Sequence, residues 1–165
     1  MKSLVGILAL VLLVVAGVVF LWPVQRVGPE PIQYGRDTCD HCRMQLSRPG
    51  FAGEMRDRHG VLTKYDDIGC LLRSLLGKHE EIPEAWVEDH TSGALIPLIG
   101  AALVRAPEVE TPMGSSIVAF ADERSAREFA DARGGEVMQV EDVLRNPSRF
   151  VPAKESRSDG TEVSS

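Results

Sequence analysis

The sequence lacks the motifs and the charge that would assign it to the commonest functional classes. Its 165 residues include 18 Lys and Arg against 24 Asp and Glu, which gives a net charge of −6. A chain without a basic stripe does not neutralise the phosphates of DNA or RNA, so we expect no nucleic-acid partner. The sequence also contains no glycine-rich phosphate loop, no H-E-x-x-H motif and no spacing that supports a Ser-His-Asp triad.

Cysteine is scarce as well, because the chain has only Cys39, Cys42 and Cys70. Three cysteines do not make the disulfide framework of a small secreted domain. In a monomer at least one of them stays unpaired, so at least one thiol needs an explanation other than a disulfide bond.

The N-terminus, by contrast, has one long apolar run. Residues 3–22 contain no charged residue, and about 20 apolar residues is the length of a helix that crosses a bilayer. A cleaved signal peptide has a shorter apolar region followed by a small-x-small site, which is missing here. We predict that residues 1–22 form a single-pass transmembrane signal anchor in the cell membrane. Lys2 favours an orientation with the domain on the extracytoplasmic side, periplasmic or outer, although Arg26 opposes it; a cleaved signal would give a soluble product in the same compartment.

Beyond this segment the composition predicts a linker, one folded domain and a tail. Residues 23–36 are rich in Pro and Gly, which is typical of an extended linker. The folded domain is predicted over residues 37–151. Residues 152–165 are polar without an apolar pattern, so we expect a disordered tail.

Within the domain the order strand, strand, helix, strand occurs twice, over about residues 37–90 and 91–151. The first helix is predicted by apolar residues that recur every three to four positions, and Asp66 and Asp67 are expected to cap it. The predicted strands cover residues 51–57, 61–65, 85–88, 101–106, 116–121 and 136–140. The predicted helices cover 68–76 and, after the cap Asp122, the residues through Arg133. The sequence therefore predicts an α+β fold of two similar small ββαβ halves behind the N-terminal transmembrane helix.

Residues 39–44, with the sequence CDHCRM, combine the side chains that bind soft metals. The stretch places two thiols, an imidazole and a thioether within six residues. Thiolate and thioether ligands suit Cu(I), whereas thiolate and imidazole ligands suit Zn(II). A C-x-x-C pair also forms disulfides or acts as a thioredoxin-like redox pair. A redox pair of that kind opens a helix after a strand, whereas this one follows a Pro- and Gly-rich linker and precedes a loop.

Two methionines favour copper at this site. Met44 lies in a polar loop without helical periodicity, and Met113 lies in a tight loop where Gly114 lets the backbone approach a neighbour closely. A closed structural zinc site needs four ligands, and no second C-x-x-C or H-x-x-x-H motif follows to complete one. The predicted metal ligands are Cys39, Cys42, Met44 and Met113, with His41 and Cys70 as further candidates and His59 as an alternative fourth zinc ligand.

Five short motifs together resemble the NosL family, the accessory proteins of nitrous oxide reductase. They read DTCDHCRM at 37–44, KYDDIGC at 64–70, TPMG at 111–114, AFAD at 119–122 and GGEV at 134–137. The resemblance extends from about residue 37 to residue 143, and the combination is specific although each motif alone is weak.

The resemblance implies a membrane-attached, extracytoplasmic copper chaperone with two similar ββαβ halves. It further implies two partners, the reductase and the membrane transporter complex encoded with it. Met113 is the best-matched ligand of the family pattern, and Cys39, Cys42 and Met44 match its motif. Many members also have an acylated N-terminal cysteine, but this chain has no cysteine before Cys39, so no ligand role of that residue carries over.

Together, these observations predict a non-enzymatic Cu(I)-binding metallochaperone that supports copper-site assembly in nitrous oxide reductase or a related cuproenzyme. Two alternatives stay open at this point. One is a thiol-disulfide oxidoreductase that uses Cys39 and Cys42, and the other is a structural zinc module that acts in protein–protein interaction.

Overall fold

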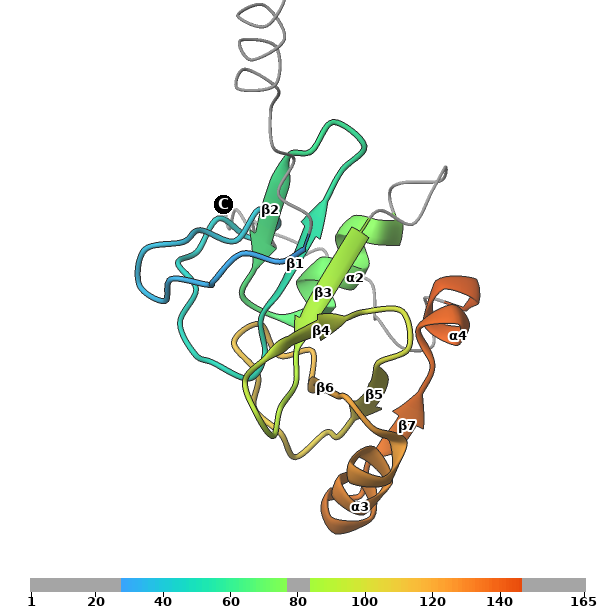
Figure 1. The fold of residues 1–165 in the computed structure, drawn as a ribbon. Helices are drawn as coiled ribbons and strands as arrows, with labels where there is room; N and C mark the ends of the chain where they lie inside the picture. The colour runs from blue at the N-terminus through green and yellow to red at the C-terminus, as the bar shows by residue number, and fades with distance from the viewer. Residues whose placement is uncertain (1–27, 77–83, 147–165) are drawn as a thin grey trace, which may run out of the picture.

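The computed structural model describes residues 28–76 and 84–146, which form two small antiparallel sheets with a helix packed on each (Figure 1). The first sheet is built from the N-terminal half of these residues and the second from the C-terminal half. The predicted α+β class is confirmed.

The first sheet has the strand order β2-β1-β3-β4, and every neighbouring pair is antiparallel. The helix α2 follows β2 and packs on β1 and β2 through its apolar face, as its periodicity predicts. The elements are β1 (Gly53–Arg56), β2 (Leu62–Tyr65), α2 (Ile68–Leu76), β3 (Glu84–Glu88) and β4 (Leu95–Pro97).

The second sheet has the order β6-β5-β7 and is also antiparallel throughout. In both sheets the first strand of the half lies between the second strand and the strand that follows the helix, so the ββαβ order occurs twice with the same pairing. The elements are β5 (Ala102–Arg105), β6 (Ile117–Phe120), α3 (Glu123–Arg133), β7 (Glu136–Met138) and the short helix α4 (Val140–Arg145).

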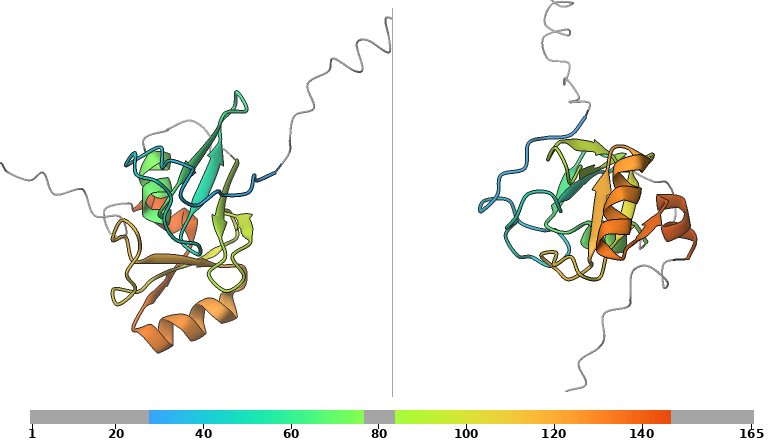
Figure 2. Two further views of the ribbon diagram at one scale, coloured as in Figure 1. Left: turned by 90° about the vertical axis from the view of Figure 1, so that its left-hand side faces the viewer. Right: turned by 90° about the horizontal axis from the view of Figure 1, so that it is seen from below.

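The two faces of the second sheet pack against different neighbours. Leu103 and Ala119 belong to the main core, which also contains the buried residues of the first half. Val104 and Val118, one position along on the same strands, belong to a second cluster with the buried face of α3. Figure 2 shows the consequence, with α3 lying on the side of the second sheet that is turned away from the first half. The first half thus shares one core with the second sheet.

Glu88, the last residue of β3, is a buried carboxylate that holds two preceding segments. Its side chain is only 4% exposed. One oxygen accepts the Tyr34 hydroxyl, and the other accepts the N–H groups of Gly50 at 2.6 Å and Ala52 at 3.2 Å. The chain before and after the cysteine motif is therefore fixed to β3.

The next residue, Asp89, joins the two sheets. It forms a parallel bridge with Ala119 of β6, and its Oδ1 accepts the Ala121 N–H at 3.0 Å. Its Oδ2 accepts both the N–H and the hydroxyl of Ser92, at 2.9 Å and 2.6 Å. Burial raises the pKa of Asp89, but these hydrogen bonds outweigh that effect and leave the pKa below its ordinary value.

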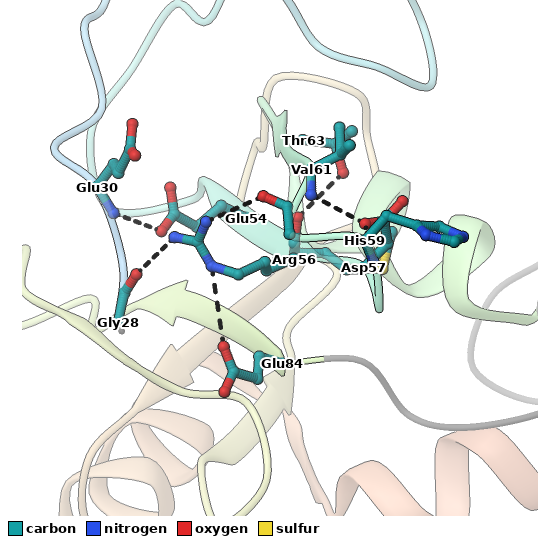
Figure 3. Close-up of polar contacts among 11 residues, drawn as sticks. Gly28, Glu30, Glu54, Arg56, Asp57, His59, Val61, Thr63 and Glu84 are labelled. Atoms are coloured by element: carbon teal, nitrogen blue, oxygen red, sulfur yellow. Dashed lines mark hydrogen bonds and ion pairs between the residues drawn. The ribbon is translucent and has the colours of Figure 1, made fainter. Parts of the chain in front are cut away.

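The described part of the predicted linker lies against the first sheet (Figure 3). The Glu30 N–H donates to Oε1 of Glu54 at 2.7 Å, and Nη2 of Arg56 donates to the Gly28 carbonyl at 2.9 Å. The Glu54 side chain is fully buried, and burial raises the pKa of this carboxyl. These contacts make the residues just before the cysteine motif part of the fold.

The predicted localisation needs correction. Within residues 28–76 and 84–146 no helix has the length and apolar composition that a membrane crossing requires. The longest described helix is α3, with 11 residues, and its exposed face is charged. This finding contradicts the predicted single-pass membrane protein with an extracytoplasmic domain. The predicted anchor (1–22) and tail (152–165) lie outside the described residues.

The hydrogen bonds to the Asp89 carboxylate predict a contribution to the free energy of unfolding that depends on pH. A carboxyl with a lowered native pKa stabilises the fold fully above its unfolded-state pKa of about 3.9, and this contribution is lost as the pH falls through the lower native value. We expect Asp89→Asn to lower the free energy of unfolding at pH 7, and the difference from wild type to shrink at pH 3. Urea unfolding at the two pH values measures this difference. The control is Asp131→Asn, on the exposed face of α3, which should change the free energy of unfolding by less than about 0.5 kcal/mol. If Asp89→Asn differs from wild type by the same amount at both pH values, the prediction is contradicted.

Candidate metal centre

The cysteine motif forms a closed turn. The Cys39 N–H donates to the Met44 carbonyl at 2.8 Å, and the Arg43 N–H donates to the Cys39 carbonyl at 2.9 Å. Arg43 has φ 64°, a left-handed conformation that is uncommon for a residue with a side chain. It reverses the chain, so that Thr38 and Gln45 pair as an antiparallel bridge at the base of the turn. The turn places both cysteines on one short loop.

Cys70, in the first turns of α2, meets this loop. The Sγ atoms of Cys39, Cys42 and Cys70 all lie within 4.8 Å of one another. Cys39 and Cys70 are buried, Cys42 is half-buried, and all three are free thiols. With about 100° of rotation per residue, Cys70 lies on the side of α2 opposite Ile68, and this contact explains its position there. We call these three residues the cysteine triad.

The three thiols of the triad differ in the direction of their pKa shifts. The largest influence on Cys39 is a hydrogen bond from the Cys70 thiol, which lowers the pKa of Cys39. Burial raises this pKa, but hydrogen bonds from the N–H groups of Cys42 and Asp66 lower it further, to about 4. The pKa of Cys70 is raised, first by this same hydrogen bond and then by burial. Burial also raises the pKa of Cys42. The hydrogen bond between Cys39 and Cys70 therefore favours the thiolate at Cys39 and the protonated thiol at Cys70. A metal that binds all three sulfurs has to displace the remaining protons.

The loop with Met113 lies against the helix turn that carries Cys70. Met113 is half-buried and packs against the core that contains Cys39 and Cys70. Its N–H donates to Oδ2 of Asp67 at 3.0 Å, while the Cys70 N–H donates to the Asp67 carbonyl at 2.9 Å. The loop with Met113 and the helix turn with Cys70 are thus joined through one residue.

The other predicted ligands lie at the surface. Met44 is 57% exposed; burial raises the pKa of Cys42, and the hydrogen bond from the Met44 N–H opposes this only in part. His41 is exposed in the same turn, and His59 is exposed in the hairpin between β1 and β2. In the described part of the chain, no His, Asp or Glu joins the triad as a fourth ligand.

Sequence reasoning assigned Asp66 and Asp67 only a capping role. Both are buried, and each carboxylate contacts a different loop: Asp66 accepts the Ser47 N–H at 2.6 Å, and Asp67 accepts the Thr111 hydroxyl at 2.6 Å. In the sequence, only the pair of acidic residues before the helix pointed to these positions. That pair predicts a helix cap but not the bonds to Ser47 and Thr111.

Comparison with known proteins places the chain in a family. A family model described as NosL matches residues 32–147. The chain belongs to the NosL family. The resemblance seen in the motifs is thereby confirmed, and Cys39, Cys42, Cys70 and Met113 all lie within the matched region.

A solved structure with a similar fold is titled "Crystal structure of the copper chaperone NosL from Shewanella denitrificans". The TM-score is 0.63 at 20% sequence identity, and the match covers 69% of this chain and 93% of that chain. At this identity the likeness establishes the shared NosL fold. No match was found among curated proteins.

The proton arrangement in the triad can be measured without metal. Replacement of Cys70 by Ala removes the largest influence that lowers the pKa of Cys39, so we expect the thiolate to form at a higher pH than about 4. Thiolate absorbance near 240 nm, followed during a pH titration of the reduced protein, reports this midpoint. Cys42→Ala removes a weaker hydrogen bond and should shift the midpoint less. An unchanged midpoint in Cys70→Ala would contradict the predicted contact.

Proposed function

We propose that this NosL-family chain is a Cu(I)-binding metallochaperone that supports copper-site assembly in nitrous oxide reductase or a related cuproenzyme. The role is one of binding and transfer, without catalysis. Its partners on this proposal are the copper-receiving enzyme and the membrane transporter complex that serves it. Family membership and the copper chaperone of similar fold support the proposal.

The observation that carries the proposal is the cysteine triad. Three sulfur atoms within 4.8 Å of one another present a soft donor set, which Cu(I) prefers. Cu(I) is stable with two or three such ligands, and a site with few ligands exchanges its metal more readily than a closed cage. A half-buried Cys42 beside two buried cysteines gives a partner one accessible sulfur on the bound ion. We propose Cys39, Cys42 and Cys70 as thiolate ligands.

The thioether ligand is proposed to be Met113, with Met44 and His41 at the surface as ligands during copper exchange. Met113 is half-buried against the same core as the triad, in a loop that Asp67 fixes. Met44 is exposed next to Cys42, where an incoming copper complex meets it first.

Zinc and redox chemistry are less well supported. A structural zinc ion takes four ligands from Cys, His, Asp or Glu, and the described residues offer only the triad as a group. A redox-active pair needs an attacking thiolate with access to its substrate, whereas Cys39, the residue with the lowered pKa, is fully buried.

A titration of the reduced full-length protein with Cu(I), in competition with a Cu(I) chelator, tests the proposed function. We expect binding of one ion per triad, lost in Cys39→Ser/Cys42→Ser, and a circular dichroism spectrum that is the same with and without metal. Zinc bound as purified, together with unfolding after its removal, would instead show a structural zinc site. Catalysed reduction of a disulfide substrate would favour the redox alternative.

The two methionines provide a matched pair of variants. Met113→Leu and Met44→Leu replace a thioether by an apolar side chain of similar size. If Met113 is a ligand, its replacement should raise the Kd for Cu(I) by about tenfold or more while leaving the fold intact. Met44→Leu should change the equilibrium Kd less. Competition titrations of both variants measure the effect, and the reverse order would assign the thioether ligand to Met44.

A further inference from the structure

Asp67 is a buried acidic residue with more contacts than a helix cap requires. Its side chain is fully buried at the start of α2. Oδ1 accepts the Gly69 N–H at 2.7 Å, which is the expected capping contact. Oδ2 accepts two further donors from the second half of the chain, the Thr111 hydroxyl at 2.6 Å and the Met113 N–H at 3.0 Å.

The packing around Asp67 leaves little freedom between the helix and the Met113 loop. A Cβ atom on Gly69 would lie 2.4 Å from Cβ of Ser115, so the first turn of α2 lies directly on the loop. The loop itself closes with the Gly114 N–H bonded to the Thr111 carbonyl at 3.1 Å. The backbone of Met113 is therefore held at both the Asp67 side and the turn side.

We propose that Asp67 is a positioning residue of the copper site, which sets the Met113 thioether relative to the cysteine triad. This inference rests on the proposed function. The bond from Met113 N–H to Oδ2 fixes the backbone of the thioether ligand, and the bond from Cys70 N–H to the Asp67 carbonyl fixes the backbone of a thiolate ligand. One residue thereby sets the spacing of two ligands that come from opposite halves of the chain. Residues that orient metal ligands typically change metal affinity by about tenfold to hundredfold when they are replaced.

Asp67→Asn is a specific test because an amide has only one acceptor oxygen. If that oxygen keeps the capping bond to Gly69, the amide nitrogen faces the Met113 N–H, and two donors oppose each other. The Thr111 hydroxyl can turn to accept from the amide, but the Met113 N–H cannot. The substitution therefore acts mainly on the Met113 backbone.

Asp89 supplies a matched control, since Asp89→Asn changes a buried, hydrogen-bonded carboxylate in the same way. Its partners are Ser92 and Ala121, and none of them belongs to the triad or to the Met113 loop. It should lower stability without a change in copper affinity.

The experiment measures Kd for Cu(I) and for Zn(II) on the full-length wild type, Asp67→Asn, Asp89→Asn and Met113→Leu, and on the double variant Asp67→Asn/Met113→Leu. Zinc serves as the thiolate probe, because zinc sites in proteins use Cys, His and carboxylates rather than methionine. We expect Asp67→Asn to raise the Kd for Cu(I) by about tenfold to hundredfold and to leave the Kd for Zn(II) unchanged. In the Met113→Leu background the same substitution should have no further effect on Cu(I), because its target is already removed.

Each other result overturns the inference. An equal loss of Cu(I) and Zn(II) affinity would mean that Asp67 supports the triad or the fold in general. Additive effects in the double variant, or an unchanged Kd for Cu(I) in Asp67→Asn, would mean that Asp67 does not act through Met113. If the wild type itself binds no Cu(I), the proposed function fails, and the inference fails with it.

Discussion

The structure depends on buried carboxylates that take backbone N–H groups as partners. A buried charge is costly unless each of its oxygens has a donor, so a carboxylate in this setting fixes whichever segments supply those donors. Glu88 fixes the chain on both sides of the cysteine motif, and Asp89 ties β3 to β6. Asp67 does the same between α2 and the Met113 loop. The loops around the cysteine motif and Met113 have little regular secondary structure, so these carboxylates supply there the order that strand pairing supplies elsewhere.

The candidate metal centre lies where three distant segments meet. The loop with Cys39 and Cys42 and the helix turn with Cys70 contribute the three thiols, and the loop with the proposed ligand Met113 is bonded to the same helix turn through Asp67. A site of this kind has little redundancy, because each segment is held by a few hydrogen bonds. Cys39 and Cys70 are buried, whereas Cys42 is partly exposed. On the proposed function, Cys42 is the sulfur that a partner reaches first.

Sequence periodicity predicted the regular elements well and their ends less well. The apolar stripe gave α2 with its bounds, Ile68–Leu76, because burial of one helix face is a local property of the sequence. Most strands are shorter than predicted, although β3 begins one residue earlier, at Glu84. Ala52, for example, donates to Glu88 before β1 begins, and Val140 starts α4 instead of ending β7. The strand β4 was not predicted, because three residues ending in Pro97 are too few for an alternating pattern.

The site was predictable only where its residues are close in sequence. The spacing of Cys39 and Cys42 marked the loop, whereas Cys70 entered only as a further candidate ligand. No local pattern says which loop that cysteine meets. The same limit applies to Asp67: its capping bond to Gly69 is local and was expected, whereas its bonds to Thr111 and Met113 cross 44 and 46 residues. Such contacts depend on how the two halves pack on each other. The local pattern of one sequence does not predict that packing.

The segment before the cysteine motif belongs to the folded unit. Glu54, on β1, is fully buried, and its Oε1 accepts the Glu30 N–H. A chain shortened to begin at the motif would leave that oxygen without its donor, and either water or a proton would have to replace the lost bond. Arg56 would lose its carbonyl partner at Gly28 as well. The unit that folds is therefore longer at its N-terminal end than the set of motifs by which the family is recognised.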